Sequence, residues 1–139
     1  RDLPKDLAAG RCYIPSRRVL DEGGYEPVAE VLFNELAVDG YFLEYDDARS
    51  GDFAPLRQVP AGKTVVLGLV STKLDRMETK DDLKRRIDLA AKVMPLDQMA
   101  ISPQCGFSST VHGNDIAVAT QAAKLKLCVE TARDVWGGV

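Results

Sequence analysis

Four short apolar runs, each bounded by turn-forming residues, predict β-strands. The runs are rich in β-branched and aromatic side chains, a composition typical of strands. They cover residues 8–14, 41–45, 64–70 and 99–102. The first run has the lowest strand propensity of the four, because it opens with Ala-Ala-Gly.

Two segments between these runs have a helical period. Residues 26–36 place several apolar side chains on one face, with Pro27 in the first turn. Residues 80–94 follow Thr79, a suitable N-cap, and carry a buried stripe of Leu83, Ile87, Ala90, Ala91 and Met94. Pro95 ends this second helix. Residues 46–62 are rich in Asp, Gly and Pro and leave room for only a turn of helix near 53–57.

A last helix is predicted over residues 118–135. Gly137 and Gly138 end it, and its predicted buried stripe is Val118, Ala122, Leu125, Val129 and Ala132. Cys128 lies on the same apolar face and is interpreted as a core residue. Strands that alternate with helices favour parallel βαβ units, so the chain is predicted to be an α/β protein.

Chemistry in such sheets lies at the carboxyl ends of the strands. The polar and thiol side chains predicted at these ends are Cys12, Glu44, Asp46, Ser71, Lys73, Gln104 and Cys105. Two cysteines and a carboxylate at one rim form a candidate three-ligand zinc site with an open position for substrate. Two alternatives stay open: the cysteines are small buried hydrophobes beside a solvated loop, or Glu44 and Asp46 hold Mg²⁺.

Composition narrows the function classes. The chain has 139 residues, 45% of them hydrophobic, and a net charge of -3, which suits one globular domain. The acidic balance, with a pI near 5.2, argues against a nucleic-acid partner. The longest apolar run, 65–70, is too short to span a membrane, and the N-terminus has no signal-peptide pattern, so a cytoplasmic location is expected. Three cysteines are too few for a disulfide scaffold.

Two further motifs carry less weight. Gly62-Lys63-Thr64 is similar to the tail of a phosphate-binding loop, but it precedes a strand instead of following one. His112, the only histidine, lies in a polar loop, where a surface residue and a general acid are both compatible with the sequence.

Several runs, taken in order, closely resemble one enzyme family. They are Leu67-Gly68-Leu69-Val70-Ser71-Thr72-Lys73, Ile101-Ser102-Pro103-Gln104-Cys105-Gly106-Phe107 and Lys124-Leu125-Lys126 with Val129-Glu130-Thr131-Ala132-Arg133. With the runs at 23–29 and 41–47, they resemble the C-terminal barrel of the cobalamin-independent methionine synthase family, over residues 23–136. The resemblance implies a TIM barrel and zinc bound by Glu44, Cys105 and Cys12. Gly10 stands where the family has a His two residues before the first cysteine, and Ser71-Thr72-Lys73 replaces a catalytic His.

The resemblance implies zinc-dependent transfer of a methyl or alkyl group to a thiol. Methionine synthases of the 5-methyltetrahydropteroyltriglutamate–homocysteine type use homocysteine and a methylated folate, and related members alkylate other thiols such as coenzyme M. Ser71, Lys73, Gln104 and Asp46 would then bind or orient the small-molecule thiol and the alkyl donor.

The number of predicted strands sets the expected size of the domain. A closed barrel needs eight βα units and this chain supplies about four, so residues 1–139 are interpreted as the C-terminal half of a (β/α)8 barrel. Such a half is expected to form a homodimer or to pair with the missing barrel half. A non-catalytic half-barrel module or subunit is the alternative to an enzyme fragment.

Overall fold

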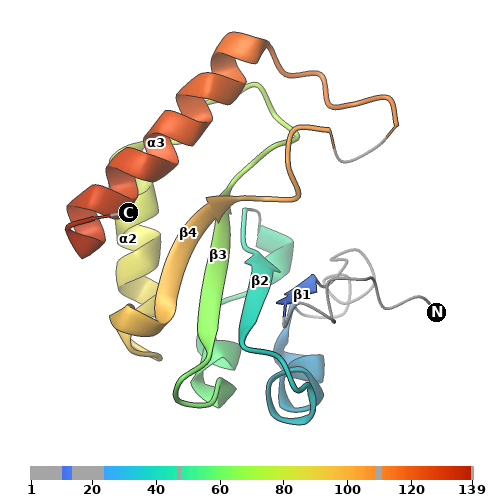
Figure 1. Ribbon diagram of the computed structural model, residues 1–139, viewed down its shortest axis with the longest axis vertical. Helices are drawn as coiled ribbons and strands as arrows, with labels where there is room; N and C mark the ends of the chain where they lie inside the picture. Colours follow the sequence, from blue (N-terminus) through green and yellow to red (C-terminus); the bar gives the residue numbers. More distant parts are fainter. Residues whose placement is uncertain (1–10, 14–23, 47, 109–110, 139) are drawn as a thin grey trace.

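A four-stranded parallel sheet organises the chain (Figure 1). The computed structural model describes residues 11–13, 24–46, 48–108 and 111–138, with backbone alone for 11–13. The strands are β1 (Arg11–Tyr13), β2 (Gly40–Glu44), β3 (Thr64–Val70) and β4 (Met99–Pro103), and they lie in the order β1-β2-β3-β4. All three pairings are parallel, which confirms the α/β prediction. The rest of the first predicted strand, 8–10 and 14, lies outside the described residues.

Two α-helices follow β3 and β4 in the described part of the chain. Helix α2 (Lys80–Ala90) begins as predicted, because the Thr79 hydroxyl accepts the Asp82 N–H at 3.2 Å. It ends at Ala90 and not at Met94, so the predicted length was wrong by one turn. Helix α3 (Val118–Trp136) ends at Gly137, whose φ of 75° is the left-handed conformation that glycine adopts readily. None of the described helices is long and apolar enough to cross a bilayer.

The remaining helical segments are short. The predicted helix over 26–36 is instead a 3-10 helix (Glu26–Val28) followed by a π-helical turn (Val31–Glu35). Pro27 does occupy the first turn, as expected. Further 3-10 helices are Ala48–Ser50, Ala54–Gln58 and Leu96–Gln98, and the second of them confirms the turn predicted near 53–57.

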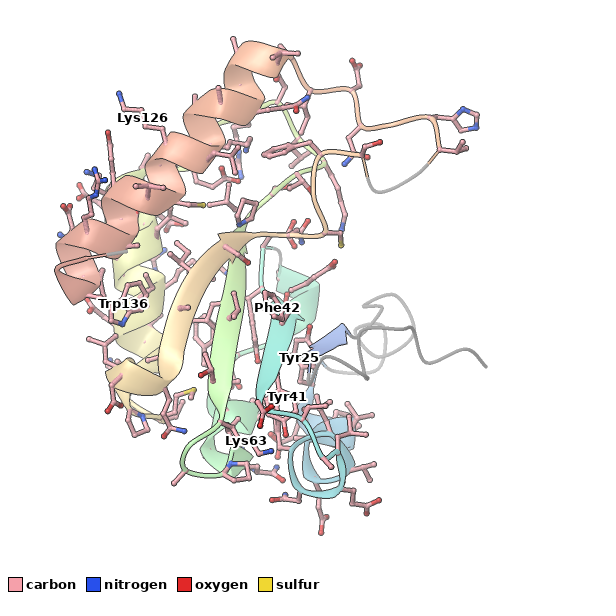
Figure 2. All side chains as sticks on the ribbon, in the orientation of Figure 1. Tyr25, Tyr41, Phe42, Lys63, Lys126 and Trp136 are labelled. Carbon is pink, nitrogen blue, oxygen red and sulfur yellow. The ribbon has the colours of Figure 1, made fainter. Side chains whose placement is uncertain are left out.

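The core fills the space between one face of the sheet and the helices. Register pairs Tyr41 with Val65 and Leu43 with Leu67, and all four side chains are buried. The Tyr41 hydroxyl donates to the Phe33 carbonyl at 3.0 Å, so this buried phenol is satisfied. Figure 2 shows Tyr41 at the amino end of β2 and Phe42 further along the same strand.

Side chains alternate between the two faces along each strand, so the residues between the core positions form the second face of the sheet. Phe42 and Glu44 pair with Val66 and Gly68, and Phe42, Glu44 and Val66 are only partly covered. The face that carries the candidate carboxylate Glu44 is therefore the one that the helices leave open.

The predicted buried face of α3 was wrong. Val118 is 80% exposed, Leu125 is 50% exposed, and Ala122 and Val129 are exposed as well. The buried side chains of α3 are Lys124, Cys128 and Thr131, so only the core position of Cys128 is confirmed. The buried Lys124 ammonium is paired there, because it donates to Glu78 and to the Arg76 carbonyl.

Candidate functional site

A thiol and a carboxylate from two strands that are not neighbours meet at the carboxyl end of the sheet. Glu44 is the last residue of β2, and Cys105 follows β4. The Cys105 thiol donates a hydrogen bond to Glu44 Oε1. The structure therefore brings together two of the residues that the sequence predicted as metal ligands.

Gly68 on β3 makes this meeting across the central strand possible. It pairs with Glu44 on one side and Ser102 on the other. A Cβ atom at this position would lie 3.0 Å from the Leu43 carbonyl oxygen and 3.6 Å from the Cα atoms of Glu44 and Gln104. Because Gly68 has no side chain, the two flanking strand ends approach each other over it.

Lys73 brings a positive charge to the pair. Its Nζ lies 3.6 Å from Glu44 Oε2, the carboxylate oxygen that does not accept from Cys105. The Lys73 N–H donates to the Ser71 hydroxyl at 3.3 Å, which closes a tight turn directly after β3. Ser71 thus shapes the turn, and Lys73 supplies the cation.

Cys105 is exposed as a residue, yet partial desolvation of its sulfur and the nearby negative charge keep the thiol protonated. Desolvation of the thiol group, then the hydrogen bond to Glu44 and its negative charge, raise the pKa of Cys105 to about 11, and Lys73 partly offsets this. At neutral pH the sulfur therefore carries the proton that it shares with Glu44. At neutral pH, a positive charge beside the sulfur would favour its deprotonation.

Tyr25 holds the Glu44 backbone in place and was not singled out from the sequence. Its hydroxyl accepts the Glu44 N–H at 2.9 Å and donates to the Glu44 carbonyl at 3.3 Å. The ring is fully buried and packs against the Tyr45 ring, with centroids 5.1 Å apart and planes tilted by 43°. Figure 2 shows Tyr25 beside β2. Burial raises the pKa of the Tyr25 phenol, which therefore stays protonated and holds both hydrogen bonds.

Asn114 is a second residue that sequence reasoning missed. Its Nδ2 donates to the Thr72 carbonyl at 2.8 Å and to the Gly106 carbonyl at 3.4 Å. The side chain thereby joins the loop after β3 to the loop after β4. A single Asn in a polar loop carries no signal of this role in the sequence.

The other predicted rim residues occupy different surroundings. Gln104 is buried, and neither atom of its amide has a hydrogen-bond partner among the described residues. Asp46 follows β2 and lies near Arg86, whose guanidinium donates to the Tyr45 carbonyl. His112 lies in an exposed stretch of the loop before α3.

Cys12 is placed by its backbone alone. It pairs with Tyr41, three residues before Glu44 on β2, so its backbone lies about 10 Å nearer the amino end of the sheet. The side chain lies outside the described residues, and its role as a ligand stays a prediction.

The donor set can be compared with what a zinc ion needs. No group of three or more His, Cys, Asp or Glu side chains gathers at metal-binding distance in the part of the chain that is described. The thiol–carboxylate pair of Cys105 and Glu44 nevertheless has the donor chemistry that Zn²⁺ accepts. Cys105 and Glu44 therefore fit the role of two of the ligands of such an ion.

The family of the chain follows from its sequence, read together with this fold and these rim residues. The sequence profile of the cobalamin-independent synthase catalytic domain matches residues 26–134, a span that includes β2, β3, β4, α2 and all but the last two residues of α3. The chain belongs to this family.

The chain is also similar to individual proteins. The chain is 53% identical over 116 residues to the uncharacterized protein YxjG of Bacillus subtilis, which covers 83% of this chain and 31% of YxjG. It is 50% identical over 115 residues to YxjH of the same organism, over 82% of this chain and 30% of YxjH. The structure is also similar, with a TM-score of 0.62 and 35% identity, to a candidate vitamin-B12 independent methionine synthase from Listeria monocytogenes, over 83% of this chain and 33% of that one. The chain thus spans about a third of the length of these relatives.

Proposed function

We propose that this chain forms part of the active site of a zinc-dependent enzyme that transfers a methyl or other alkyl group to a small-molecule thiol, as in methionine synthesis. The observation that supports the proposal best is the contact between Cys105 and Glu44 at the open end of the sheet. Thiolate and carboxylate are both zinc ligands, and the family of the chain agrees with this chemistry. Cys12 is the third proposed ligand.

The residues of the chain have separate tasks in this proposal. Zn²⁺ bound by Cys105 and Glu44 would supply the positive charge that keeps a substrate thiol in its thiolate form for attack on an alkyl carbon. Tyr25 fixes the Glu44 backbone, so that the carboxylate stays in reach of Cys105. Lys73 lies beside this pair and is suited to orient an acidic group of the acceptor or the donor.

We extend the proposal to the domain as a whole. Strands β1 and β4 are the outer strands of the described sheet, and its second face carries Glu44. A (β/α)8 barrel would continue the sheet beyond these strands and enclose that face. The rest of the barrel would come from further family sequence or from a second copy of the chain.

A second candidate is a non-catalytic module of the same fold. Lys73 favours it, because an ammonium group 3.6 Å from Glu44 already balances the carboxylate charge. Gly10, in place of a histidine, also favours it.

Metal binding distinguishes the two candidates. Zinc content and Co²⁺ titration of the purified chain should give close to one site, and Cys105→Ser and Glu44→Gln should each weaken binding by at least about tenfold. Cys128→Ser is the matched control, because that thiol is buried in the core. Less than about a tenth of an equivalent of metal in the parent chain would contradict the enzyme proposal and favour the module.

A further inference from the structure

A fully buried lysine lies in the first half of helix α3, on the side that also buries Cys128 and Thr131. The Lys124 side chain is 0% exposed. Its Nζ donates to Glu78 Oε2 at 2.8 Å and to the Arg76 carbonyl at 2.6 Å. Figure 1 shows that the segment between β3 and α2, which contains Arg76 and Glu78, runs past α3. A buried ammonium needs such partners, so α3 and this segment are held together at one charged point.

The second oxygen of the same carboxylate reaches the end of β3. Glu78 Oε1 accepts the Ser71 N–H at 3.0 Å. Ser71 is the first residue after β3 and is itself buried. One carboxylate therefore bridges α3 and the turn that begins at Ser71.

That turn ends at the candidate site. The Ser71 hydroxyl accepts the Lys73 N–H, and Lys73 Nζ lies 3.6 Å from Glu44 Oε2. A continuous series of polar contacts thus runs from the interior of α3 to the carboxylate that accepts from Cys105.

We propose that Glu78 and Lys124 are positioning residues that hold the turn at Ser71 so that the Lys73 ammonium stays next to Glu44. Their effect on the site is electrostatic and passes through Lys73. With Lys73 in place, the carboxylate is partly neutralised and a divalent cation binds it less tightly. The buried pair would thereby set how strongly the rim holds its metal, an inference that rests on the proposed function of Glu44 and Cys105.

This role has a signature that general destabilisation does not share. In Glu78→Gln the amide nitrogen cannot accept, so one of the two hydrogen bonds to Ser71 and Lys124 is lost. Release of Lys73 should then make Co²⁺ binding tighter, by about threefold to tenfold. Damage to the site by a purely structural defect would make binding weaker.

The experiment uses the whole 139-residue chain and four variants besides the parent: Glu78→Gln, Lys73→Gln, the double variant of these two, and a control. Lys73→Gln should tighten Co²⁺ binding in the same direction as Glu78→Gln, and the double variant should bind no more tightly than Lys73→Gln alone. Glu130→Gln is the matched control: it removes an exposed α3 partner of Lys80, the first residue of α2, at 3.5 Å, and should leave the affinity unchanged. Weaker binding in Glu78→Gln, or an additive effect in the double variant, would overturn the inference.

Hydrogen exchange supplies a readout that needs no metal. Amide exchange measured by mass spectrometry over residues 71–78 should be at least about tenfold faster in Glu78→Gln than in Glu130→Gln. Equal exchange would overturn the positioning role. A parent chain that binds no Co²⁺ would refute the proposed function, and the exchange result would still decide whether Glu78 holds the turn. If Glu78→Gln does not fold, the charge-balanced double variant Glu78→Gln/Lys124→Met takes its place in both measurements.

Discussion

Gly68→Ala offers a direct test of how the site is assembled. The added Cβ would lie 3.0 Å from the Leu43 carbonyl oxygen, and backbone atoms surround it on both flanks. Overpacking of this kind costs about 1–3 kcal/mol. The reduced freedom of the unfolded chain returns about 0.4–1 kcal/mol. The free energy of unfolding should therefore fall by about 1.3 kcal/mol, within a range of about 0–2.6 kcal/mol.

Gly40→Ala is the matched control for this change. Its Cβ would lie 3.1 Å from the Thr64 carbonyl oxygen, at the amino end of the same pair of strands. Urea denaturation should show a similar loss of stability in both variants. Only Gly68→Ala should separate Glu44 from Cys105 and weaken Co²⁺ binding, by about tenfold. Equal Co²⁺ affinities in two equally destabilised variants would refute the reasoning that Gly68 lets the two ligands meet.

Four further predictions concern buried and polar groups in and around the site. Lys124→Met should lower the free energy of unfolding by about 3–5 kcal/mol in urea denaturation, because the charged Glu78 loses its cationic partner. A loss below about 1 kcal/mol would contradict a buried ion pair. Tyr25→Phe should cost about 1–3 kcal/mol, because the Glu44 N–H loses its acceptor, and an unchanged urea midpoint would contradict this. The pKa of Cys105 is raised from 9.0 to about 11, so the folded chain keeps a proton that the unfolded chain releases, and stability should fall as pH rises through this window. Glu44→Gln should lower that pKa and speed alkylation of Cys105 at pH 8 to 9, as followed by peptide mass spectrometry; an unchanged rate would show that Glu44 does not hold the thiol proton.

Local features of the fold could be predicted from the sequence because they depend on neighbours in the chain. The run Thr64–Val70 is β-branched and bounded by turns, and it forms β3 at the predicted residues. The Thr79 hydroxyl caps α2 as expected, and Gly137 ends α3. Placement of Glu44 and Cys105 at the same rim followed from the parallel order of the strands.

The surroundings of helix α3 could not be predicted in this way. Apolar residues such as Leu125 occupy one side of the helix, and Lys124 with Thr131 lies on another. The hydrophobic period predicts that the apolar side of the helix is buried, yet Lys124 is among the buried residues. Its ammonium is paired with Glu78 and the Arg76 carbonyl, which lie 46 and 48 residues away in the chain. A charged side chain can be buried only where polar partners pair with it, and the partners of Lys124 lie in the segment between β3 and α2.

The sequence by itself determined the order of strands and helices, the family and the residue types at the rim, since each of these depends on local pattern. Tertiary structure decided which of those residues meet. Cys105 reaches Glu44 because Gly68 leaves room between their strands, and Lys73 joins them because Glu78 holds the turn that carries it. Close contacts across a sheet depend on the separation of backbones and on buried charges that pair over long distances in the chain, and neither quantity is encoded in the period of a single segment.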